Sequence, residues 1–132
     1  MKAHSILFRY LDGLPISDSE VKILVDFAKE NFDNGPTTLY RWSVKNPFED
    51  KELNSFSCTV EKSTKIGMYF QKSSLGQVYE VDAIPLLTNE NIEFMIQKYC
   101  DYEPYRNVLL KMLKREGEYL ILNTDIISMR VL

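Results

Sequence analysis

The chain has 132 residues, with 16 basic and 19 acidic side chains and therefore a formal charge of −3 at neutral pH. A hydrophobic content of 45% is enough for one buried core, which excludes a disordered chain and predicts a single domain over residues 1–132. Apolar segments are far shorter than the roughly 20 residues of a membrane-spanning helix, so no membrane role is expected. The mild acidity makes nucleic acid an unlikely partner, because such partners require clustered basic side chains.

The cysteine and histidine content argues against a metal site and against secretion. Two thiols, Cys58 and Cys100, fit a reducing compartment, and Arg9 interrupts the first apolar stretch too early for a signal peptide. With His4 as the single histidine, no spacing typical of a zinc site is present. We therefore expect a cytoplasmic protein without a bound metal.

The first third of the chain predicts a strand, a helix and a second strand. Residues Ala3–Tyr10 carry several large apolar side chains and are predicted to form a strand. Ser17 and Glu20 have the spacing of a capping box, and apolar residues then recur at helical intervals, which predicts a helix over Asp18–Asn31. β-Branched and aromatic residues favour a strand over Thr37–Val44.

The remainder of the chain mixes short strands with short helices. The predicted elements are, in order, a short strand at Ser55–Thr59, a helix over Val60–Phe70, a strand over Gln77–Asp82, a helix over Asn89–Tyr99, one or two helical turns within Tyr105–Lys114, and strands at Glu116–Leu122 and Ile126–Leu132. Because the strands do not alternate regularly with helices, the pattern favours an α+β fold with mixed or antiparallel sheets.

Three short segments carry chemically useful side chains in a fixed order: Leu39-Tyr40-Arg41, Ser55-Phe56-Ser57 and Glu116-Gly117-Glu118. The succession of Arg, Ser-x-Ser and Glu-x-Glu resembles the arginine–serine–glutamate class of mono-ADP-ribosyltransferases. The surroundings are similar too, since an aromatic residue precedes the arginine and an aliphatic strand follows the second glutamate. The resemblance covers about Thr38–Leu122 and implies an ADP-ribosyltransferase-like core.

The resemblance implies transfer of ADP-ribose from NAD to an arginine of a target protein, with release of nicotinamide. Glu118 would stabilise the oxocarbenium-like ribosyl cation, as carboxylates do in glycosidases. Glu116, expected about 7 Å away on the same face of a strand, would orient and help deprotonate the acceptor guanidinium. Arg41 would bind the NAD phosphates through its planar fork. Ser55 would position Glu118 or the nicotinamide ribose.

The remaining site residues are assigned to the nicotinamide end of NAD. Ser57 would support the strand that carries Ser55. A flat apolar wall for the nicotinamide ring would come from aromatic residues, for which the candidates are Trp42, Phe56, Tyr69 and Phe70. The implied co-substrate is NAD and the implied partner is a protein with an acceptor arginine. The small size suits a bacteriophage or bacterial effector.

Plainer interpretations remain for each segment taken alone. Arg41 is then a surface residue of a strand, and the serines and glutamates form solvated faces. A binding module of the inhibitor or immunity type would use Glu116 and Glu118 as an acidic recognition face and Trp42 as an interface anchor. A related transferase acting on nucleic acid is the third possibility, disfavoured by the negative charge.

Overall fold

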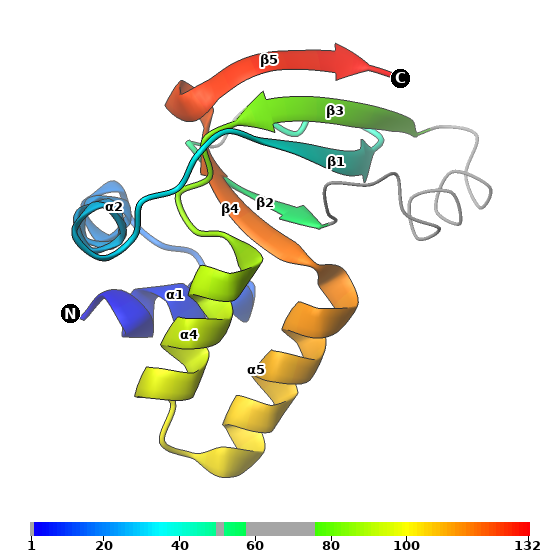
Figure 1. Cartoon of the computed structure of the whole chain (residues 1–132). Helices are drawn as coiled ribbons and strands as arrows, with labels where there is room; N and C mark the ends of the chain where they lie inside the picture. The colour runs from blue at the N-terminus through cyan, green and yellow to red at the C-terminus, as the bar shows by residue number, and fades with distance from the viewer. Residues whose placement is uncertain (1, 50–51, 58–75) are drawn as a thin grey trace.

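A computed structural model of the chain describes residues 2–49, 52–57 and 76–132, which form two antiparallel sheets and a helical layer (Figure 1). One sheet has the order β1-β3-β5, and its strands are β1 (Thr37–Ser43), β3 (Gln77–Ala83) and β5 (Ile126–Val131). The other pairs β2 (Leu53–Ser57) with β4 (Glu118–Leu122). The helices are α1 (Ala3–Leu11), α2 (Asp18–Asn31), α4 (Asn89–Tyr99) and α5 (Glu103–Glu116), and a 3-10 turn spans Asn123–Asp125. The predicted α+β class is confirmed, and of the mixed or antiparallel sheets that were expected the described strands form antiparallel ones.

Strand β4 lies between the three-stranded sheet and the helices (Figure 1). Its side chains alternate between two cores, as the twofold period of a strand requires. Leu120 and Leu122 belong to the core shared with the helices, whereas Ile121 packs with Leu39 and Val81 of the three-stranded sheet. Because both faces of β4 are covered, its residues position the two layers relative to each other.

The strand predicted for Ala3–Tyr10 is wrong, because this segment forms helix α1. Its buried residues Ala3, Ile6 and Leu7 recur at intervals of three and four, which places them on one helical face. That face packs against α2 and α4 in the helical layer. A short apolar run fits either a buried strand or a buried helix, and here the packing partners decided the outcome.

Helices α2 and α4 match their predicted bounds, and each begins at a capping box. The hydroxyl of Ser17 accepts a hydrogen bond from the backbone N–H of Glu20 at 3.3 Å, and the Glu20 carboxylate accepts one from the Ser17 N–H at 2.9 Å. Thr88 and Asn91 repeat this arrangement at the start of α4. Such reciprocal bonds satisfy backbone donors that the first turn leaves unpaired.

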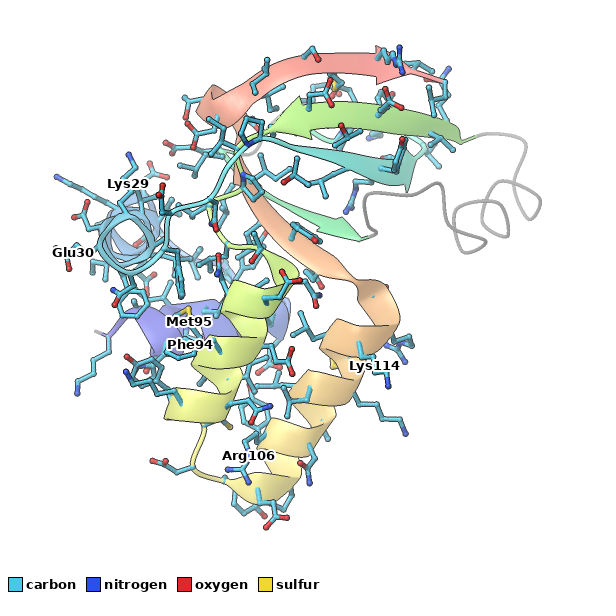
Figure 2. The ribbon with its side chains drawn as sticks, viewed as in Figure 1. Lys29, Glu30, Phe94, Met95, Arg106 and Lys114 are labelled. Atoms are coloured by element: carbon cyan, nitrogen blue, oxygen red, sulfur yellow. The ribbon has the colours of Figure 1, made fainter. Side chains whose placement is uncertain are left out.

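Helix α5 extends further than its predicted core of Tyr105–Lys114. Pro104 stands in the first turn, where its missing N–H costs nothing, and Gly117 ends the helix in a left-handed conformation. Figure 2 shows Lys114 extending away from this helix, whereas Met95 of α4 is fully buried in the helical layer. The helix predicted for Val60–Phe70 lies outside the described residues. In the parts of the chain that the structure describes, no helix is long and apolar enough to cross a membrane.

Candidate functional site

Arg41 lies on the face of β1 that is directed toward the β2–β4 sheet. It has the same orientation along the strand as Leu39, which is buried against Ile121 of β4. The intervening positions point the other way, as shown by Thr38, which donates a hydrogen bond to Asp82 on the outer face. Arg41 is itself half-buried, and its Nε atom is shielded from solvent. A guanidinium therefore projects between the two sheets.

Glu118 is the first residue of β4 and is also half-buried. Burial raises the pKa of its carboxyl, and the negative charge of Glu116 raises this pKa further, whereas the positive charge of Arg41 lowers it. The backbone carbonyl of Glu118 accepts a hydrogen bond from Asn89 of α4 at 3.3 Å, which ties the start of the strand to the helical layer. Arg41 and Glu118, distant in sequence, thus lie close enough for their charges to interact.

Tyr10 is a third member of this group, and the sequence interpretation missed it. Its hydroxyl donates a long hydrogen bond, 3.5 Å, to the backbone carbonyl of Leu53 at the start of β2. Burial raises the pKa of Tyr10 to about 12, the Glu118 carboxylate adds to the rise, and the Arg41 charge opposes it. Tyr10 lies in the last turn of α1. Its position beside the Arg41–Glu118 pair could therefore be expected only if the first segment were assigned as a helix.

The predicted position of Glu116 is wrong. This residue ends α5, and Gly117 separates it from the strand, so Glu116 and Glu118 do not lie on one face of a strand. The Glu116 carboxylate accepts a hydrogen bond from Nε of Arg115 at 3.0 Å. Its charge still acts on Glu118, so both acids belong to the same neighbourhood. The helix persists to Glu116 because its last turn is basic and a glycine follows to end it.

Gly117 sets the direction in which the chain passes from Glu116 to Glu118, and its φ of 61° is left-handed. We predict that Gly117→Ala lowers the free energy of unfolding by about 1–2 kcal/mol, because a Cβ in this conformation clashes with the following carbonyl. Gly35→Ala is the matched control, since a Cβ there meets open space. Its effect should stay within about 0.5 kcal/mol. Urea denaturation measures both, and equal losses would contradict the prediction.

The serine motif lies on the strand that pairs directly with the glutamate motif. Ser57 is the backbone partner of Glu118, and Ser55 is the partner of Leu120. Trp42 pairs with Val78 in the three-stranded sheet. At Trp42 and at Ser55, Phe56 and Ser57 the structure describes the backbone alone, so the roles predicted for these side chains stay predictions. Tyr69 and Phe70 lie outside the described residues.

The site therefore combines a guanidinium, a carboxylate with a raised pKa and a phenol, contributed by β1, β4 and α1. A guanidinium binds phosphate oxygens, and a carboxylate partly removed from water stabilises a nearby developing cation more strongly than it would in water. Within the described ranges, no group of three or more metal-ligating side chains gathers.

Fold and candidate site together define an α+β protein in which Arg41, Glu118 and Tyr10 lie near one another where the sheets adjoin the helical layer. No protein family, curated protein or solved structure matches the chain.

Proposed function

We propose that the protein is an NAD-dependent mono-ADP-ribosyltransferase that modifies an arginine of a target protein and releases nicotinamide. The observation that carries the proposal is the interaction of Arg41 with Glu118, since these residues come from the first and last of the three ordered motifs. The direct pairing of β2 with β4 supports it, because it brings the Ser-x-Ser segment beside Glu118. We also propose that it acts in the cytoplasm of the producing cell or of an infected host.

The proposed reaction breaks the bond between the nicotinamide nitrogen and C1′ of the ribose. The bonding electrons leave with nicotinamide, and the ribosyl group acquires positive charge, which the Glu118 carboxylate stabilises. Arg41 binds the NAD phosphates and thereby orients the ribose toward Glu118. A guanidinium nitrogen of the acceptor then attacks C1′ and gives up a proton, for which Glu116 is the proposed acceptor.

The test is incubation with NAD labelled in the adenylate half and a cell lysate, together with measurement of free nicotinamide. We expect label on protein and stoichiometric nicotinamide release. A thermal melt with millimolar NAD should show a saturable increase in melting temperature, because a ligand that binds only the native state stabilises it. Absence of label, release and melting shift would eliminate the transferase. It would favour a binding module, whose acidic recognition surface would then come from two elements, with Glu116 on α5 and Glu118 on β4.

Glu116→Gln should separate the two halves of the reaction. We predict that transfer to arginine falls about 100-fold or more, the usual contribution of a general base, whereas slow hydrolysis of NAD persists. Glu103→Gln, an exposed substitution at the opposite end of α5, is the control and should change neither activity. If both activities fall equally in Glu116→Gln, the division of labour between the two glutamates is wrong.

A further inference from the structure

A hollow of about 500 Å³ opens between the end of α1, the turn into α2 and the start of β2. We call it the Tyr10 hollow. Its lining residues are Tyr10, Gly13, Leu14, Pro15, Ile16, Asp18, Val21, Glu52 and Leu53. The volume falls within the range of small-molecule sites. None of the functions assigned above uses this space.

The lining is apolar with two carboxylates. Its walls are formed mainly by apolar side chains, which include those of Leu14, Pro15 and Ile16. The carboxylates of Asp18 and Glu52, when ionised, can only accept hydrogen bonds. Among the described residues that line the hollow there is no lysine or arginine, so the lining itself offers no cationic partner for a phosphate. An uncharged nucleoside suits the hollow better. Its base is flat with apolar faces, and its ribose hydroxyls donate hydrogen bonds to carboxylates.

Tyr10 connects this hollow with the Arg41–Glu118 site. Tyr10 lines the hollow, and the charges of Glu118 and Arg41 both act on its hydroxyl. NAD consists of an adenosine, two phosphates and a nicotinamide riboside in that order. With the phosphates on Arg41 and the nicotinamide ribose on Glu118, the adenosine still requires a binding space, and the Tyr10 hollow shares Tyr10 with this site.

The rim of the hollow is held in place before any ligand arrives. Arg9 donates a hydrogen bond to the carbonyl of Pro15 at 3.0 Å, and the N–H of Leu14 donates to the carbonyl of Arg9 at 3.0 Å. On the other side of the turn, the hydroxyl of Tyr105 donates to the carboxylate of Asp12 at 2.6 Å. A preformed site saves the entropy of ordering a loop on binding.

From this chemistry and position we propose that the Tyr10 hollow is the subsite for the adenosine half of NAD. The proposal rests on the proposed function for the identity of the dinucleotide. It assigns a binding role to Leu14 and Glu52, which are exposed and lie outside the three motifs.

The experiment compares the two halves of NAD, adenosine monophosphate and nicotinamide mononucleotide, as separate ligands of the full chain. The variant is Leu14→Ser combined with Glu52→Gln, and the matched control is Leu132→Ser combined with Glu103→Gln, which changes the same residue types at exposed positions elsewhere. We expect the dissociation constant for adenosine monophosphate to rise about tenfold or more in the variant, a change of about 1.4 kcal/mol. Binding of nicotinamide mononucleotide, and both ligands with the control, should be unchanged.

Thermal melts without ligand verify that each variant is folded. Equal affinity of the variant and the wild type for adenosine monophosphate would overturn the proposed subsite. Equal rates and KM values for nicotinamide release from NAD and from nicotinamide mononucleotide would overturn it as well, since the adenosine half would then contribute nothing to binding. Failure of the proposed function has a different signature. If adenosine monophosphate binds the wild type and binds the variant more weakly, but NAD releases no nicotinamide, the transferase function is wrong and the nucleoside-binding role of the hollow stands.

Discussion

Glu118→Gln should reduce nicotinamide release from NAD by about 100- to 1000-fold, the usual cost of removing one preorganised electrostatic group from a transition state. Glutamine keeps the size of the side chain and its ability to form hydrogen bonds, but it cannot neutralise the developing ribosyl cation. The KM for NAD should change little, because Arg41 and the Tyr10 hollow provide the proposed binding contacts. Initial rates of nicotinamide release measure the effect.

The same substitution should make the folded chain more stable at neutral pH. The pKa of Glu118 is raised above its ordinary value of 4.5, chiefly by burial, so ionisation is less favourable in the native state than in the unfolded one. Below the ordinary pKa the carboxyl is neutral in both states and carries no such penalty. As the pH rises through the raised pKa, wild type should lose stability relative to Glu118→Gln.

Urea denaturation across this pH range measures the stability difference, and Glu93→Gln, an exposed acid on α4, is the control. Nicotinamide release by wild type should rise with pH over the same interval, because only the ionised carboxylate stabilises the cation. A Glu118→Gln protein that is more stable but inactive is the expected outcome for a residue whose burial lowers stability and whose charge is needed for activity. An active Glu118→Gln protein would contradict the role assigned to this carboxylate.

Ile121→Ala should produce the largest loss of stability among the substitutions considered. The Ile121 side chain is fully buried and packs with Leu39 and Val81, so it joins β4 to the three-stranded sheet. Truncation in a core costs about 2–5 kcal/mol, because transfer free energy is lost and a cavity remains. The free energy of unfolding of a typical protein domain is about 5–15 kcal/mol, so this loss would be a large fraction of the total.

Ile127→Ala is the matched control for Ile121→Ala, since Ile127 lies on β5 and is 60% exposed. Its effect should stay within about 0.5 kcal/mol. Urea denaturation monitored by Trp42 fluorescence compares the two variants. Similar losses at both positions would show that Ile121 does not join the two layers through buried packing.

The elements that could be predicted are those with local signals. Helices α2 and α4 carry capping residues whose hydrogen bonds involve partners three positions away, so their bounds follow from the chain itself. Helix α1 has no side-chain cap, and its apolar run was therefore ambiguous. The prediction for Glu116 is wrong for a related reason, because the alternation of the following strand continues backward in the sequence pattern, whereas Gly117 ends α5 there.

By itself the sequence determined the charge, the capped helices, most strands and the residue types available for chemistry, because these depend on composition and on neighbours a few positions apart. Only the tertiary structure decided that Arg41 and Glu118 lie close enough for their charges to act on each other and on Tyr10, and that Tyr10 also lines a hollow. Their proximity depends on the pairing of β2 with β4 and on the packing of α1 against the other helices. The raised pKa of Glu118 also arises there, since burial and charges from distant segments cause it.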